Sequence, residues 1–168
     1  AQVARLLLQA NLAYGESNSN GVSHIRRLKS RQECRGYLNE ALALEPTNAG
    51  ALGLLGRVEI DDGQFAKAHK LFNASLDHPP GPAQQYCNLG YWALKTERPA
   101  LAERYFLQAL DCDRQSAAAF CGIAHAKRSL GQFDVAYLHY RKLLETGAKW
   151  ESVYSGMLTC AQHLEVNK

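Results

Sequence analysis

Three side chains suited to metal binding or nucleophilic chemistry, Cys87, Cys121 and His125, lie in the middle of the chain. Cys121 and His125 are one helical turn apart, which places them on one face of a helix, and Cys87 lies well upstream on another predicted helix. Thiolates and imidazoles are ligands that zinc prefers. No carboxylate or further histidine completes the set, and packed helices lie ~8–10 Å apart, which is long for shared ligands. We therefore expect no metal and no cofactor.

Other candidates for catalysis are weaker. The six histidines are scattered, and no Ser/His/Asp or Cys/His group lies on elements that would bring its members together. The glycine-rich stretch at residues 50–56 resembles a phosphate-binding loop, but it follows no strand and its glycines have the wrong spacing. We expect a protein that is not an enzyme.

The composition fits a globular, helix-rich domain. The 168 residues are 46% hydrophobic and 21% charged, which excludes wholesale disorder. A net charge of +3 is too small to indicate a nucleic-acid binder, and no run approaches the ~20 apolar residues that a membrane span needs. The five cysteines include no CxxC pair, so we expect a reducing, cytoplasmic location. The chain does not begin with Met, which suggests that it is either excised from a longer protein with flanking domains or processed.

The elements that would position any site recur at a fixed interval along the chain. Four columns share this interval: a small residue (Gly56, Gly90, Ala124), an alanine (Ala68, Ala102, Ala136), an aromatic residue (Phe72, Phe106, Tyr140) and a large apolar residue (Leu52, Tyr86, Phe120). In each unit two apolar runs flank a short break, at residues 62–64, 96–98 and 130–132. This pattern predicts pairs of antiparallel helices, in which the small residue allows close approach of a neighbouring helix. Such a pair cannot bury its own apolar face and must stack on the next.

A 34-residue pattern with these columns resembles the tetratricopeptide repeat (TPR) family over nearly the whole chain. The repeat at residues 49–82 fits best, with signature residues at Leu52, Leu55, Gly56, Ala68, Phe72 and Pro80. The tyrosine usual in the first helix is replaced by Glu59, Ala93 and Lys127. The resemblance implies an all-α, right-handed solenoid of about four helical hairpins with a terminal capping helix.

We predict a single TPR domain over residues 1–168. Its repeats would cover residues 1–48, 49–82, 83–116 and 117–150, and a capping helix would follow at 151–165. Repeat one would carry an insertion at residues 17–30. Ser30 and Glu33 would then form a capping box that starts the second helix of this repeat.

The resemblance also implies that the first helices of the hairpins line a concave groove. One column on these helices consists of Gln9, Arg57, Tyr91, His125 and Thr159. Donor groups and an aromatic ring suit an extended peptide or a partner helix, which makes the chain a protein-interaction scaffold. The alternative is a polar face that only confers solubility. Asn88 also belongs to the predicted groove, but Leu54 and Gly122 hold the matching places, so we do not expect the carboxylate clamp of some TPR domains.

Arg26, Arg27 and Lys29 belong to the densest basic run of the chain, inside the predicted insertion. The run suits contact with an acidic partner or a phosphate-rich surface. The alternative, a flexible solvated loop, is the ordinary role of a polar surface segment.

Two further functions stay open. The chain could be a TPR appendage of a larger enzyme, such as a methyltransferase or a hydroxylase. Residues 88–110 also resemble the TPR lipoproteins that serve as pilotins in type IV pilus assembly, which implies a periplasmic place at the bacterial outer membrane. Five cysteines, and no lipid-bearing cysteine at the N-terminus, count against that place.

Overall fold

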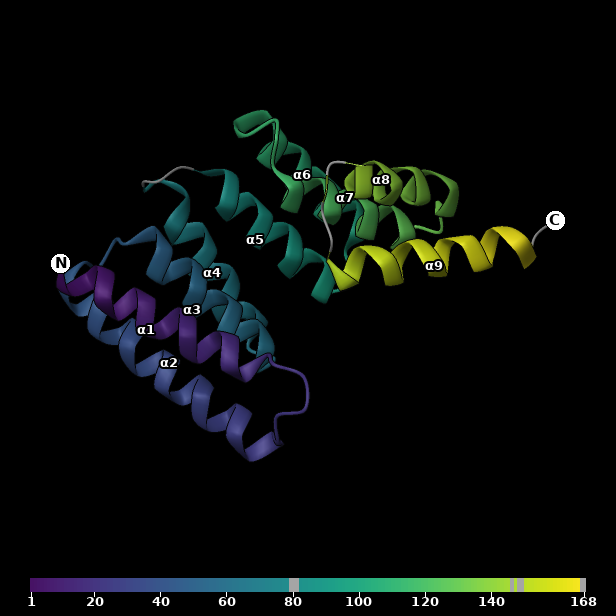
Figure 1. Cartoon of the computed structure of the whole chain (residues 1–168). Coiled ribbons are helices and arrows are strands. Elements are labelled where there is room, and N and C mark those ends of the chain that lie inside the picture. The colour runs from purple at the N-terminus through teal and green to yellow at the C-terminus, as the bar shows by residue number, and fades with distance from the viewer. Residues whose placement is uncertain (79–81, 146, 148–149, 167–168) are drawn as a thin grey trace. The chain divides into compact units, whose positions relative to one another are not determined.

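The protein is described by a computed structural model over residues 1–78, 82–145, 147 and 150–166. Within this part the chain forms nine helices and no strand, so the predicted all-α class is confirmed. The helices are α1 (Gln2–Ser17), α2 (His24–Leu44), α3 (Ala49–Asp61), α4 (Phe65–Leu76), α5 (Pro82–Lys95), α6 (Pro99–Cys112), α7 (Ala117–Ser129), α8 (Phe133–Glu145) and α9 (Glu151–Val166) (Figure 1). They fall into two compact units, residues 1–85 and 86–168.

In the first unit, α1 packs on α2, α2 on α3 and α3 on α4. Figure 1 shows α1 and α2 as one antiparallel hairpin. Buried, mostly small or branched side chains form the core between α1, α2 and α3. They are Leu6, Ala10, Ala13 and Tyr14 of α1, Cys34, Leu38 and Ala41 of α2, and Ala51, Leu54, Leu55 and Val58 of α3. Alternating large and small residues let the helix axes approach while the interior stays closely packed.

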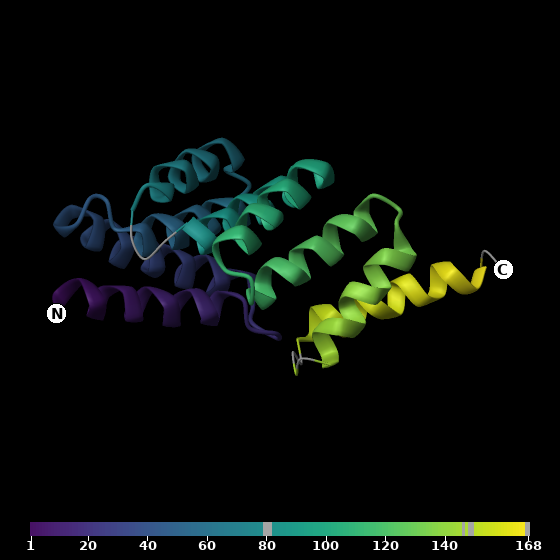
Figure 2. The same cartoon turned by 90° about the horizontal axis from the view of Figure 1, so that it is seen from above.

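In the second unit, α6 packs on α7, α7 on α8 and α8 on α9. Figure 2 shows α7 and α8 as an antiparallel pair that α9 follows. The core of this group consists of Cys121, Ala124, Ala136, Tyr140, Leu143, Val153 and Cys160. The thiols of this core serve as small apolar groups, because burial raises the pKa of Cys121 and of Cys160 above the ordinary thiol value.

The small-residue column performs the predicted packing role. A Cβ atom at Gly56 would lie 2.3 Å from the ring of Phe72, and one at Gly90 would lie 2.6 Å from the ring of Phe106. Real Cβ atoms do not approach so closely, so a side chain at Gly56 or Gly90 would force the aromatic ring of the second helix away from the backbone of the first. This confirms that the small residue permits close helix approach.

The three breaks between helices of a pair also lie where the period places them. Gly63 and Gly131 have φ values of +74° and +76°, and Glu97 has φ of +59° at the equivalent place of the middle hairpin. A left-handed residue after the last helical turn ends the helix and reverses the chain. Two of the three breaks therefore have glycine, the residue that the left-handed conformation favours, and the third has a glutamate.

The predicted start of the second helix is wrong. Helix α2 begins at His24, where the hydroxyl of Ser23 accepts a hydrogen bond from the backbone N–H of Arg26 at 3.4 Å. Ser30 is buried within the helix and caps nothing. The additional residues of the first hairpin are therefore mostly helical, and only residues 18–23 connect α1 to α2. Arginine, leucine and lysine are good helix formers, so nothing in residues 25–29 interrupts the turns added before Ser30.

Candidate functional site

In the first unit the predicted binding column is represented by Gln9 of α1 and Arg57 of α3. Gln9 is half-buried and Arg57 is exposed. The guanidinium carbon of Arg57 lies 4.8 Å from the centre of the Tyr14 ring, in cation–π geometry. The Tyr14 hydroxyl donates to Oδ2 of Asp61 at 2.9 Å, and burial raises the pKa of Tyr14 to about 12. The Arg57 guanidinium thus packs against the neutral ring of Tyr14, and the Arg57 side chain is exposed to solvent.

In the second unit Tyr91 is the aromatic member of the column. It lies on α5 between buried Gly90 and Trp92, yet its own ring is only half-buried. The Lys95 amine lies 5.3 Å from the centre of the Tyr91 ring. An aromatic ring that stays partly open on a rigid helix offers apolar area at a low cost in entropy.

His125 is more enclosed than the column predicts. Its Nε2 lies 4.0 Å from Sγ of Cys121, and its ring centre lies 5.6 Å from that of Tyr140. Burial and the nearby charge of Arg128 lower the pKa of His125, although a hydrogen bond that the imidazole donates to the backbone carbonyl of Ser152 acts in the opposite direction. The imidazole is therefore neutral at pH 7 and contacts the start of α9.

The two remaining predicted groove residues are partly committed to their own helices. Thr159 is half-buried, and its hydroxyl donates to the carbonyl of Ser155 at 2.9 Å. Asn88 is only 6% exposed, which leaves little of its amide open to a partner. Arg57, which is exposed, and the half-buried Tyr91 and Gln9 are accordingly the members of the predicted set whose side chains stay open to a partner.

The predicted anionic-contact residues are open to solvent. Arg26, Arg27 and Lys29 are exposed on α2, and Lys29 lies 4.0 Å from Glu33 one turn later. They belong to a helix rather than to a flexible loop. Their charges are therefore held at fixed spacing along one helix end.

The next basic residues of the same run serve a different purpose, which the sequence reasoning missed. Arg31 Nη1 contacts Oδ1 of Asp62 at 2.9 Å, and Arg35 contacts Oδ2 of Asp62 at 2.5 Å and Oε1 of Glu59 at 3.1 Å. Lys67 Nζ lies 3.0 Å from the same Glu59 oxygen. Glu59 is 2% exposed, and a buried carboxylate needs such partners. The signal in the sequence was an acid in the place of the family's tyrosine.

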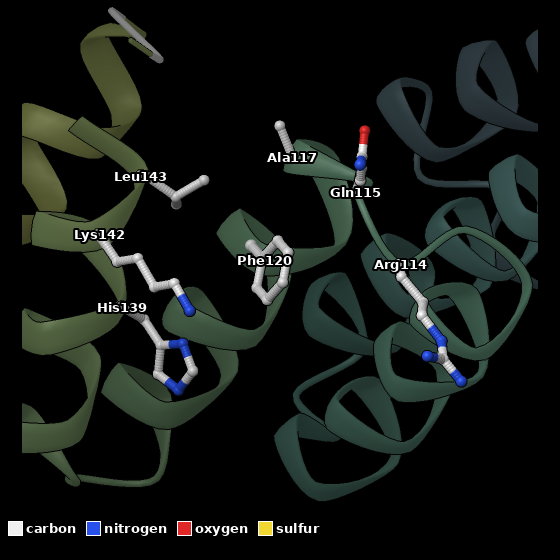
Figure 3. Close-up of a pocket in the computed structure, with 7 residues that line it drawn as sticks. All are labelled: Arg114, Gln115, Ala117, Phe120, His139, Lys142 and Leu143. Carbon is white, nitrogen blue, oxygen red and sulfur yellow. The ribbon is translucent and has the colours of Figure 1, made fainter. Parts of the chain in front are cut away.

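A cavity in the second unit contains none of the predicted binding column. It has a volume of about 430 Å³ and is lined by residues of the α6–α7 connection, α7 and α8, namely Arg114, Gln115, Ala117, Phe120, His139, Lys142 and Leu143 (Figure 3). The Lys142 amine lies 5.8 Å from the centre of the Phe120 ring. Of these residues only Phe120 belongs to the four columns described above, so those columns did not point to the cavity.

Among the described residues, no three His, Cys, Asp or Glu side chains are placed to hold a metal ion. Cys121 and His125 do come together, but burial raises the pKa of the Cys121 thiol, which disfavours the thiolate that a metal requires. Within the same part of the chain, no helix combines the length and the hydrophobicity needed to span a membrane.

In comparisons by sequence, no family model and no curated protein matches the chain. In comparisons by structure, a tetratricopeptide repeat protein from Parabacteroides merdae matches with a TM-score of 0.69 and 19% identity. The match covers 95% of this chain and 59% of that protein, so this chain spans less than two thirds of its length.

Of two other structural neighbours, one was solved in complex with a peptide and the other is described as having a peptide-binding site. The second TPR domain of human RPAP3, solved with the HSP70 peptide SGPTIEEVD, matches with a TM-score of 0.56 and 18% identity over 63% of this chain and 88% of that domain. YrrB, described as a TPR protein with an unusual peptide-binding site, matches with a TM-score of 0.57 and 18% identity over 94% of this chain and 76% of its own. Sequence identities of 18–19% support a shared fold and nothing more specific. The resemblance of residues 88–110 to pilotins stays a prediction.

Proposed function

We propose that this chain, whose fold is that of the tetratricopeptide repeat proteins, is a non-catalytic scaffold that binds a peptide or a partner helix on its first helices. The observation that carries the proposal is Tyr91. Its neighbours on α5 are buried in the repeat packing, while its own ring stays partly open beside the Lys95 amine. Half-exposed aromatic rings on rigid elements are common anchors of protein interfaces.

The second support is chemical. Arg57, at the equivalent place on α3, is exposed and held over the Tyr14 ring. A preoriented guanidinium donates hydrogen bonds to carbonyl or carboxylate oxygens at little further entropic cost. Arg57 and Tyr91 thus offer a hydrogen-bonding group and a stacking group at the same position of successive first helices.

The third support comes from proteins of the same fold. The RPAP3 domain was solved with a peptide, and YrrB is described as having a peptide-binding site. Repeat proteins commonly bind along the surface that their stacked units form. We infer the same kind of ligand for this chain, without assigning a partner.

A randomised peptide library displayed against the whole chain tests the proposal. Peptides that it selects should bind Tyr91→Ala more weakly by ~1–3 kcal/mol, measured by isothermal titration. Tyr105→Ala is the matched control, because Tyr105 is also a half-buried tyrosine but lies on α6, a second helix. Equal affinity of the selected peptides for wild type and Tyr91→Ala would remove the first-helix face as the binding surface.

A further inference from the structure

We infer that the cavity between α7 and α8 is a second binding site, which accepts a large apolar side chain flanked by carboxylates in a protein partner. The inference rests on the proposed function, because it assumes that the ligand belongs to a protein. The cavity is separate from the predicted binding column, since none of the column residues lines it. Its volume of about 430 Å³ lies within the range of ordinary ligand pockets.

The basic side chains that line the cavity favour an anionic ligand. Arg114, His139 and Lys142 contribute three basic groups, and no carboxylate lines the cavity. None of the ion pairs in the described part of the chain uses these three residues. An acidic partner would therefore meet basic groups that form none of these ion pairs.

Two acidic groups on the elements beside this cavity are already engaged. Glu103 of α6 pairs with Lys127 of α7 at 2.8 Å. Oδ1 of Asp113 accepts a hydrogen bond from the backbone N–H of Gln115 at 3.0 Å. The local balance is thus positive on the side of α8, where Lys142 and His139 lie one turn apart.

The floor of the cavity selects an apolar group beside the anion. Phe120 is half-buried, Leu143 is buried, and Ala117 adds a small side chain at the first turn of α7. Figure 3 shows the Lys142 side chain extending from α8 toward the Phe120 ring. Charge and apolar surface are therefore adjacent, which suits an acidic residue next to a phenylalanine or leucine rather than an isolated anion.

Protonation of His139 should make the affinity for an anionic ligand depend on pH. Burial lowers the pKa of His139, Lys127 and Lys142 lower it further, and Glu103 acts against them. The group is mainly neutral at pH 7 and gains its charge as the pH falls. A bound carboxylate stabilises that charge, so affinity should rise between pH 7 and pH 5.5.

Three acetylated and amidated pentapeptides test the inference on the full chain. The first has a phenylalanine flanked by two aspartates on each side, the second replaces the phenylalanine with alanine, and the third replaces the aspartates with lysines. We expect the first to bind best, to shift the amide signals of Phe120, His139 and Lys142 in ¹H–¹⁵N spectra, and to lose affinity in high salt. Equal affinity for the three peptides, or shifts confined to other helices, would overturn the site.

Charge-neutral variants then assign the contact. Lys142→Gln should weaken binding of the first peptide about 3-fold or more. Arg141→Gln removes the same charge from the adjacent residue of α8, which is exposed and lies 3.6 Å from Glu145, and should change affinity less. Equal losses in both variants would mean general attraction to a basic surface and would also overturn the site.

Failure here is distinguishable from failure of the proposed function. Tyr91→Ala should leave the affinity for the pentapeptides unchanged, because Tyr91 does not line the cavity. If library-selected peptides require Tyr91 while no pentapeptide binds, the second site is wrong and the scaffold function stands. If the acidic pentapeptide binds as described while no selected peptide depends on Tyr91, the cavity site stands and the first-helix binding surface is wrong.

Discussion

Gly122 of α7 packs against the ring of Phe106 on α6, so closely that a Cβ atom at the glycine would lie 2.3 Å from Cε1 of the ring. The same ring meets Gly90 of α5 on another side, at 2.6 Å from an added Cβ. Tyr140 of α8 has the equivalent relationship with Gly156 of α9, at 2.4 Å. The aromatic rings of Phe106 and Tyr140 thus reach the backbone of the first helix that follows each of them.

Gly122→Ala should destabilise the fold by ~1–3 kcal/mol, because the added methyl group overpacks a ring that has no room to move. Urea unfolding followed by circular dichroism measures the change. Gly36→Ala is the control, since Gly36 is exposed on α2 and an added Cβ would meet no atom within 4 Å. That substitution should stabilise the chain by ~0.5–1 kcal/mol through helix propensity, and a loss of stability in both variants would contradict the packing argument.

Glu97→Gly should raise the free energy of unfolding by ~0.5–1 kcal/mol, because Gly adopts a positive φ without the steric cost that a side chain imposes. Glu97 has φ of +59°. Thermal unfolding gives the measurement. Gly131→Ala, at the equivalent break with φ of +76°, should lower stability for the same reason. A loss of stability in Glu97→Gly together with a gain in Gly131→Ala would show that chain entropy, not backbone strain, controls these turns.

Tyr140→Phe should leave stability unchanged or raise it by up to ~1 kcal/mol. Tyr140 is fully buried, and its hydroxyl has no hydrogen-bond partner among the described residues. Burial raises the pKa of this hydroxyl well above its ordinary value, so it stays protonated and contributes no charge. Phe72 and Phe106 occupy the equivalent places in the preceding hairpins. A clear loss of stability would mean that the hydroxyl has a partner, such as buried water.

The sequence period predicted the helix pairs, their breaks and the role of Gly56 and Gly90, because those features depend on contacts inside one repeat. Gly122 and Gly156 also stand one full period apart, but Leu54 and Asn88 hold the earlier places of their column. The column therefore does not look like a set of small residues. The contact that Gly122 and Gly156 make with the ring of the preceding hairpin is visible only in three dimensions.

The start of α2 shows a second limit. Ser23 and Ser30 are both acceptable caps, and Glu33 completes a capping box only for Ser30. The helix begins after Ser23 because Ser30 is buried against neighbouring helices, and burial is a tertiary property. Arg31 and Arg35 likewise read as members of a basic run, whereas their partners Glu59 and Asp62 lie on and just after α3.

Acid should weaken the contact between α2 and α3 through Asp62. Partial burial acts to raise the pKa of Asp62, but hydrogen bonds and charge from Arg35 and Arg31 prevail and hold it below 3.8. The unfolded chain therefore binds the proton more readily than the folded one. The contribution to stability is complete above pH 3.8 and is lost as the pH falls below that value toward the lower pKa of the folded state.

Asp62→Asn should accordingly lower the melting temperature at pH 7 and flatten its decline between about pH 5 and pH 3. Exposed Asp134 on α8 gives the control: Asp134→Asn should leave both the melting temperature and its pH profile close to wild type. Scanning calorimetry across this range distinguishes the two variants. An unchanged slope in Asp62→Asn would mean that Arg31 and Arg35 find their acid-sensitive partner elsewhere, with buried Glu59 the group to substitute next.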